Sequence, residues 1–111
     1  MITVTDEVLR EMVRAIVREV DPEEIWLFGS RARGEVRPDS DVDLLVVERE
    51  PFGPQRERMA EMARIRRALS AFRVPKDILV FGADEVAYWR DSLNHIIPRC
   101  RREGRVLYVR P

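Results

Sequence analysis

Two short apolar runs, separated by a segment rich in charged and turn-forming residues, constrain the fold of this chain most. The runs cover residues 25–28 and 43–47 and are rich in aromatic and β-branched side chains. Each is too short for a buried helix, so we expect two strands. Gly29-Ser30 closes the first run, and Asp41-Val42-Asp43 opens the second.

The rest of the chain alternates helical and strand patterns. Thr5 can cap a helix that continues to Val20 and stops at Asp21-Pro22. We further expect a loop over 34–39, a helix over 55–72, a strand over 77–81, a helical region over 82–102 that Pro98 splits or kinks, and a last strand over 106–109. Gly104 is expected to cap that helical region. This order predicts an α+β fold, with a sheet layered against helices.

Length and charge exclude several classes of protein. A chain of 111 residues predicts a single domain spanning residues 1–111. Twenty acidic residues balance twenty basic ones, which makes nucleic acid an unlikely main partner. The sequence has no apolar run of about 20 residues that could cross a membrane. One cysteine, Cys100, and an N-terminus without an apolar signal core favour the cytoplasm.

The carboxylates that lead the second strand predict a magnesium site. Asp41 and Asp43 are two residues apart, so in extended backbone both point to one face. Two such charges repel unless a cation lies between them, and all-oxygen ligands favour Mg²⁺. Asp77 begins the next expected strand and can join them if the two strands are neighbours. Three carboxylates that hold two Mg²⁺ ions suit in-line phosphoryl displacement.

The turn after the first strand predicts a phosphate site. Gly29 allows the backbone to approach a phosphate closely, and the helical turn that begins at Ser30 offers free N–H groups and a hydroxyl. Arg31 and Arg33 follow at once and can bind a triphosphate. Together with the carboxylates, this turn indicates transfer of a nucleotide from a nucleoside triphosphate.

Three other interpretations of this segment fail. Gly29 and Gly34 have P-loop spacing, but Glu35 and Val36 stand where Lys and Ser or Thr are required. An EF-hand loop starting at Asp39 would need glycine where Leu44 stands. The stretch from Ser40 resembles a helix capping box. The apolar run that follows it is short, β-branched and soon broken by proline, which favours a strand.

The fixed spacing of Gly29-Ser30 and Asp41-Val42-Asp43 resembles the signature of the nucleotidyltransferase fold of the DNA polymerase β superfamily. The chain resembles the smallest members of this superfamily, the minimal nucleotidyltransferases, in its length, in the sequence of residues 27–34 and in the presence of Asp77. The resemblance implies a mixed sheet of about four strands packed against helices. It also implies Mg²⁺-dependent transfer of a nucleoside monophosphate, commonly AMP from ATP, to a hydroxyl. Many minimal members resemble antitoxins that silence a HEPN-domain toxin by adenylylating a tyrosine or by binding.

Three functional hypotheses follow. In the first, an enzyme binds the triphosphate with Gly29, Ser30, Arg31 and Arg33, holds metal with Asp41 and Asp43, and uses Asp77 to orient or deprotonate the acceptor hydroxyl. In the second, the chain is an antitoxin that only occludes its partner. In the third, the acceptor is a small molecule, although the chain has no second domain to bind one.

Residues outside this motif receive structural interpretations. His95 is expected to have a structural or surface role, and Cys100 and Trp26 are expected in the core. The arginines at 56, 58, 64, 66 and 67 are expected to form a mostly solvated helix face, partly balanced by Glu57 and Glu61.

Overall fold

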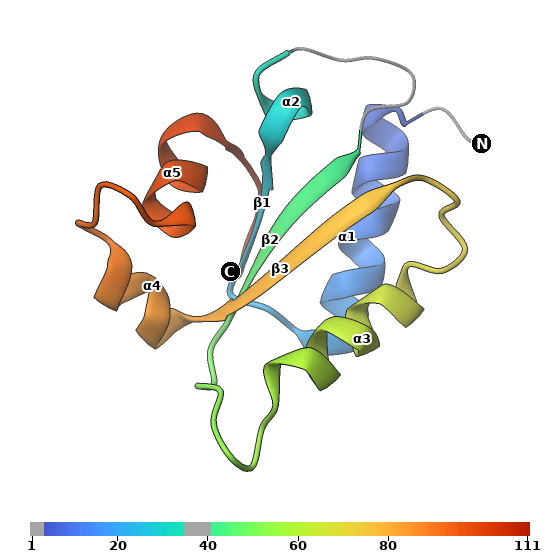
Figure 1. Cartoon of the computed structure of the whole chain (residues 1–111). Coiled ribbons are helices and arrows are strands. Elements are labelled where there is room, and N and C mark those ends of the chain that lie inside the picture. The colour runs from blue at the N-terminus through green and yellow to red at the C-terminus, as the bar shows by residue number, and fades with distance from the viewer. Residues whose placement is uncertain (1–3, 35–40) are drawn as a thin grey trace.

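The computed structural model describes residues 4–34 and 41–111, which form five helices and four strands (Figure 1). In chain order the elements are α1 (Asp6–Val20), β1 (Glu24–Phe28), α2 (Gly29–Ala32), β2 (Val42–Glu48), α3 (Arg58–Ala68), β3 (Lys76–Gly82), α4 (Ala83–Trp89), α5 (Ile96–Glu103) and β4 (Arg105–Val109). The expected first helix and all four expected strands are confirmed, and no strand end differs by more than one residue. No helix in the described ranges is long and apolar enough to span a membrane.

The strands form one mixed sheet in the order β3-β2-β1-β4. Strand β1 pairs antiparallel with both β2 and β4, whereas β2 and β3 are parallel. A parallel pair needs a crossover connection, which α3 supplies between β2 and β3. The predicted α+β fold with a four-stranded mixed sheet is therefore confirmed.

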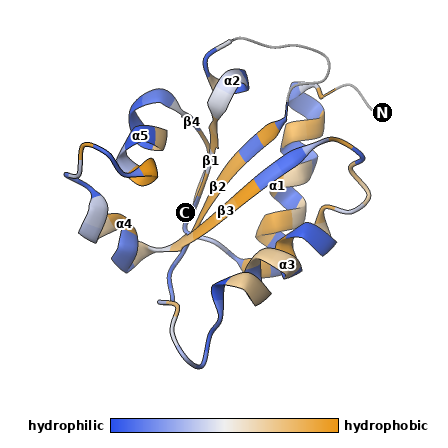
Figure 2. Ribbon diagram, in the orientation of Figure 1, coloured by the Kyte–Doolittle hydropathy of each residue, from blue (hydrophilic) through white to orange (hydrophobic). Residues whose placement is uncertain are grey.

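Helices cover both faces of the sheet. Helices α1 and α3 pack on one face, and α4 and α5 lie on the other (Figure 1). Side chains of β2 alternate between the two layers, since Leu44 and Val46 join the α1 and α3 core while Leu45 and Val47 join the α4 and α5 core. Figure 2 shows mainly hydrophobic central strands with hydrophilic bands near one end of β2 and β3.

The first helix has the caps that its sequence predicts. The Thr5 hydroxyl accepts the Val8 N–H at 3.2 Å, and Asp21 adopts the left-handed conformation (φ 48°) at the other end. Leu9, Met12 and Ile16 are buried against the sheet, at the spacing of one helical face. Helix α1 therefore depends on tertiary packing as well as on its local signals.

The helix expected over 55–72 is shorter than its pattern indicates. Gly53 and Arg56 exchange backbone hydrogen bonds of 3.0 Å in a tight turn, so α3 begins only at Arg58. Beyond Ala68 the chain continues in tight turns, such as the one closed by Phe72 N–H and the Leu69 carbonyl at 3.0 Å. Apolar residues continue at helical spacing beyond the end of α3, because Leu69 and Phe72 reach the same core from these turns.

The helical region expected over 82–102 is two helices, and the prediction that Pro98 breaks it is wrong. The break falls between Trp89 and Ile96, where His95 Nδ1 accepts the Ile97 N–H at 3.1 Å and caps α5. Pro98 lies in the first turn of α5, where its missing N–H is not needed. Gly104 caps α5 as expected, and a Cβ there would lie 2.7 Å from the Leu27 carbonyl oxygen. The structural role expected for His95 is confirmed.

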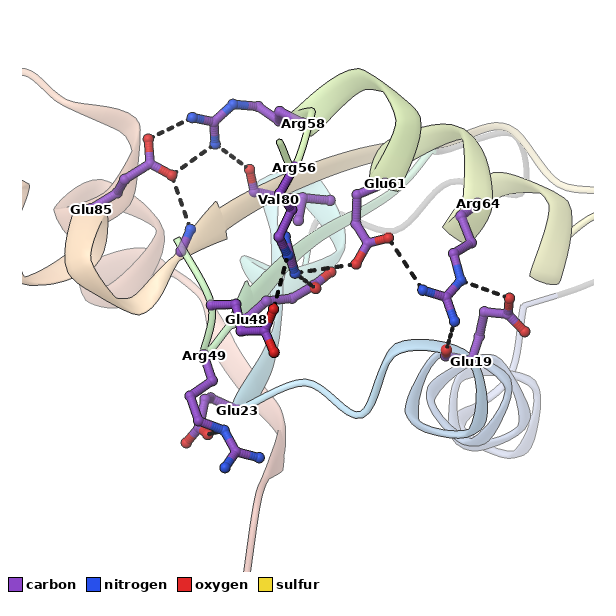
Figure 3. Close-up of polar contacts among 12 residues, drawn as sticks. Glu19, Glu23, Glu48, Arg49, Arg56, Arg58, Glu61, Arg64, Val80 and Glu85 are labelled. Carbon is purple, nitrogen blue, oxygen red and sulfur yellow. Dashed lines mark hydrogen bonds and ion pairs between the residues drawn. The ribbon is translucent and has the colours of Figure 1, made fainter. Parts of the chain in front are cut away.

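A buried carboxyl at the end of β2 was not anticipated from the sequence. Glu48 is only 3% exposed and is paired with Arg56 of the turn before α3. Arg56 also contacts Glu61 at 3.4 Å, and Arg64 contacts Glu61 at 3.6 Å and Glu19 of α1 at 2.9 Å (Figure 3). These five residues, here called the Glu48 cluster, connect β2, α3 and α1.

The expectation of a mostly solvated arginine face is confirmed for Arg64, Arg66 and Arg67, which are exposed, and is wrong for Arg56 and Arg58. The Arg56 and Arg58 side chains are only 27% and 35% exposed. Arg58 binds Glu85 of α4 through both carboxylate oxygens and also donates to the Val80 carbonyl at 2.7 Å (Figure 3). Of the two acids expected to balance the arginines, Glu61 pairs as expected. The spacing of charges along one helix does not show which of them will meet another element.

Burial, together with the hydrogen bond and the negative charge of Glu61, raises the pKa of Glu48 to about 8, against the opposing effect of Arg56. Glu48 and Glu61 thus compete for one close cation, and Glu48 retains its proton at neutral pH. Because the pKa is higher in the folded protein than its ordinary 4.5, the folded state binds more protons than the unfolded state between these values. The free energy of unfolding therefore falls as pH rises through this window.

Replacing Glu48 by Gln should flatten this pH dependence. We expect the free energy of unfolding of the unmodified protein to fall between about pH 5 and pH 8, and the E48Q variant to lose clearly less over the same range. Urea denaturation at a series of pH values measures both. Glu50→Gln is the matched control, because Glu50 contacts the same arginine at 3.6 Å but is 78% exposed. Equal slopes for E48Q and E50Q would contradict this assignment.

Burial along α3 predicts a second contrast. Ile65 is fully buried, whereas Met59 on the same helix is 66% exposed. Ile65→Ala should lower the free energy of unfolding by about 2–5 kcal/mol, because it removes buried methylenes and leaves a cavity. Met59→Ala should change it by less than about 0.5 kcal/mol. Denaturant titration of both variants checks the difference, and similar losses would show that α3 packs differently.

Candidate active site at one end of the sheet

Strand pairing brings the predicted carboxylates and the glycine turn to one end of the sheet. Asp43 of β2 pairs in register with Phe28, the last residue of β1, and with Asp77 of β3. Gly29 follows Phe28 directly, and α2 continues from that end of β1 (Figure 1). The expectation that strands two and three are neighbours, with Asp77 beside Asp43, is confirmed.

The backbone of Gly29 lies directly against the Asp43 carboxylate. Gly29 has a φ of 72°, in the left-handed region that favours glycine. A Cβ at this position would overlap Asp43 Oδ2 and lie 3.1 Å from its Cγ. Glycine is required here both by the conformation of the turn and by the close approach of Asp43. The two halves of the sequence motif are thus in contact.

The charge of Asp43 is destabilised by its surroundings. Burial is the main cause that raises the pKa of this carboxyl, and the negative charges of Asp41 and Asp77 raise it further. Arg31 and Arg33 act in the opposite direction. All four charged residues that the sequence selected therefore act on Asp43, although Asp41 and Asp77 are themselves exposed.

Ser30, Arg31 and Arg33 come from the turn that follows β1. Ser30 and Arg31 are half-buried within α2, a helix of four residues, and Arg33 is its exposed C-terminal cap. The expected helical start at Ser30 is confirmed within one residue. The loop expected over 34–39, with Glu35 and Asp39, lies outside the described residues apart from Gly34. Residues 42–48 form a strand, as expected against the EF-hand and capping-box interpretations.

The donor set fits a hard divalent cation. Its side chains supply only carboxylate oxygens, and burial, followed by the negative charges of Asp41 and Asp77, raises the pKa of Asp43, which a bound cation would offset. Within residues 4–34 and 41–111, no group of three His, Cys, Asp or Glu side chains is arranged to hold a metal by itself. Mg²⁺ is commonly bound by one or two carboxylates, with substrate phosphates and water as the other ligands. Asp41 and Asp43 satisfy that requirement.

Sequence reasoning missed one contact at this site. Arg66 of α3 lies 3.9 Å from Asp77 Oδ1, and both side chains are about half exposed (47% and 56%). The helical pattern assigned Arg66 to a solvated face. No local signal connects it with Asp77, because α3 and β3 come into contact only when the helix packs on the sheet. An exposed pair of this kind contributes little stability but adds positive charge beside the carboxylates.

The family model of the nucleotidyltransferase domain matches residues 9–102, which include every residue of this site. The chain belongs to the nucleotidyltransferase domain family. The enzymatic hypothesis is thereby confirmed at the level of the family. No curated protein matches the chain.

Solved structures share the fold of this nucleotidyltransferase at low identity. A Sulfolobus solfataricus protein assigned as a nucleotidyltransferase is 23% identical, with a TM-score of 0.67, over 94% of this chain and 79% of that one. A toxin–antitoxin complex with AMP-PNP gives 18% identity and a TM-score of 0.60 over 90% and 73%. A tri-AMPylated HEPN toxin from Shewanella oneidensis with its MNT antitoxin gives 15% and 0.59 over 95% and 73%.

The contact between Gly29 and Asp43 predicts a difference between two glycines of the nucleotidyltransferase. Gly34 has a similar φ of 78°, but a Cβ there would meet nothing within 4 Å. Gly34→Ala should therefore lower the free energy of unfolding only by the backbone term, about 1–2 kcal/mol. Gly29→Ala should lower it further and reduce nucleotide transfer at least about tenfold, because Asp43 must move. Denaturation and transfer assays test this, and equal effects of the two substitutions would refute it.

Proposed function

We propose that this nucleotidyltransferase moves a nucleoside monophosphate, AMP from ATP, to a hydroxyl of a protein acceptor in a Mg²⁺-dependent reaction. The observation that carries the proposal is the register of the sheet. Asp43 lies between Asp77 on one side and the Gly29 turn on the other. A triphosphate at the turn and a hydroxyl at Asp77 would then meet at the Asp43 carboxylate.

The nucleotide side of the proposed site is built from the turn after β1. Gly29 lets the turn pack against the Asp43 carboxylate, so a phosphate group bound at the turn would lie beside that carboxylate. The Ser30 hydroxyl donates a hydrogen bond to a phosphate oxygen, and Arg31 and Arg33 neutralise the triphosphate. Both arginines already act on the charge at Asp43, which supports their place beside the bound phosphates.

Asp41 and Asp43 would hold the metal, with Asp77 beside them. When bound, Mg²⁺ neutralises the charge that develops on the phosphate oxygens as the pyrophosphate leaves. Asp77 accepts a hydrogen bond from the acceptor hydroxyl and takes its proton as the oxygen attacks the α-phosphorus. The new bond joins that oxygen to phosphorus, and the bond between the α-phosphorus and the pyrophosphate oxygen breaks.

The acceptor that we propose is a tyrosine of a HEPN-domain toxin. The structural neighbours described above include two toxin–antitoxin complexes, one with AMP-PNP and one with a tri-AMPylated HEPN toxin. Their identity to this chain is low, so they support this acceptor through the shared fold alone. We place the reaction in the cytoplasm, which agrees with the buried, unpaired Cys100.

Removing one carboxylate tests the mechanism. Asp43→Asn should reduce transfer of label from α-labelled ATP to the partner toxin at least about 100-fold, because it removes a metal ligand and its charge. Asp91→Asn is the control, since Asp91 is exposed and follows α4 at a distance in sequence from the motif. Mass measurement of the partner identifies the group added. Full transfer by the D43N variant would refute the assignment.

The same variants separate catalysis from occlusion. If the chain acts by modification, a protein with Asp41→Asn and Asp43→Asn should bind the toxin but no longer neutralise it. Neutralisation that survives both substitutions, with a stoichiometric complex and no mass gain, would replace the enzymatic proposal by the binding hypothesis. A toxin that never gains mass, while a small molecule in the cell extract does, would assign a small-molecule acceptor.

A further inference from the structure

A small cavity adjoins the proposed triphosphate site and has no role in the mechanism above. Its volume is about 210 Å³, and its lining is largely apolar. The residues around it are Phe28, Gly29 and Arg33 at the end of β1 and in the α2 turn, and Ile96, Arg99, Cys100 and Glu103 of α5. Two of these, Gly29 and Arg33, also belong to the predicted nucleotide site.

One face of α5 makes up half of this cavity. Its four lining residues, at positions 96, 99, 100 and 103, follow the spacing that places side chains on a single helical face. Burial raises the pKa of the Cys100 thiol to about 11, so this side chain is a neutral, soft surface at physiological pH. Asp43 contributes to that shift, so Cys100 lies within electrostatic reach of this proposed metal ligand.

The cavity lies on the nucleotide side of the site. Across the sheet the order is β3, β2, β1, so Asp77 and the cavity lie on opposite sides of Asp43. The alternation of side chains places Asp43, Asp77 and Phe28 on the sheet face that α5 covers. A group entering the cavity would thus share a face with the reacting atoms and would be separated from the proposed acceptor hydroxyl by Asp43.

We infer that this cavity holds the nucleobase of the triphosphate, between Phe28 of β1 and the Ile96 and Cys100 face of α5. The inference rests on the proposed function, since it extends the same site. The volume is below the range of about 300–1,000 Å³ typical for whole drug-sized ligands, which suits one heterocycle better than a complete nucleotide. The aromatic, aliphatic and thiol surfaces favour a flat, apolar ring face.

The rim of the cavity offers polar contacts to the edge of the base. Arg99 and Glu103 form a salt bridge of 3.2 Å, with side chains 62% and 45% exposed. Arg99 can donate to a ring nitrogen or a carbonyl, and Glu103 can accept from an exocyclic amino group. Because a donor and an acceptor are adjacent and both are solvated, the rim supports binding of a base without strong selection among bases.

The experiment compares ATP with inorganic tripolyphosphate, each with Mg²⁺, by calorimetric titration. The unmodified protein should bind ATP more tightly than tripolyphosphate, because only ATP has a base to fill the cavity. Ile96→Trp fills the cavity and should weaken ATP binding about tenfold, the scale of one stacking contact, with tripolyphosphate binding unchanged. Leu93→Trp is the matched control, because it adds the same side chain at a position 82% exposed and outside the cavity.

Each outcome bears on a separate conclusion. Tripolyphosphate binding by the I96W variant also shows that this variant is folded. If I96W does not fold, Cys100→Leu is the second variant that fills the same cavity. Unchanged ATP affinity in a folded, filled variant would overturn the base pocket but leave the proposed function intact. Unchanged ATP affinity with a raised KM for the protein acceptor would assign the cavity to the acceptor ring instead. Failure of the unmodified protein to bind either ligand would overturn the proposed function as well.

Discussion

Parallel pairing of β2 with β3 places Asp43 directly beside Asp77, and the arrangement of the site depends on this register. A shift of one residue would turn Asp43 toward the opposite face and bury a charge in the α1 and α3 core. The register is maintained by apolar residues that follow each carboxylate and alternate between two covered faces. Core packing thus holds like charges together at the end of the sheet, where Arg31 and Arg33 partly oppose their repulsion.

Strand β2 has an ionisable group near each end, and the two are stabilised differently. Asp43 lies on the α4 and α5 face and depends on arginines from the turn after β1. Glu48 lies at the other end, on the face of α1 and α3, where it pairs with Arg56 while burial and Glu61 raise its pKa. Glu48 is buried against Arg56, whereas Asp43 lies beside Asp41 and Asp77, whose side chains are exposed. Only Asp43 therefore has the character of a site.

Much of the site could be predicted because its signals are local. Gly29-Ser30 and Asp41-Val42-Asp43 lie at the ends of short apolar runs, and such runs favour strands. The limits of α3 and the break between α4 and α5 were predicted less well. After α3, tight turns keep apolar residues in contact with the core although the helix has ended. Between α4 and α5, the start of α5 is set by His95 and not by Pro98. The periodicity of apolar residues indicates which residues are buried. It does not fix where a helix ends, because a helix and a series of tight turns can bury the same residues.

By itself, the sequence determined the strands, the first helix, the alternation of faces along the strands and the residue types of the motif, because these depend on residues close together in the chain. Only the tertiary structure decided which distant residues meet. Contact of the Gly29 backbone with Asp43, the position of Arg66 beside Asp77, the Glu48 cluster and the cavity under α5 all join separate elements. The physical reason is that charge and burial act through space. A carboxylate such as Glu48 looks like a solvated strand end in sequence and becomes a buried acid only when α3 closes over it.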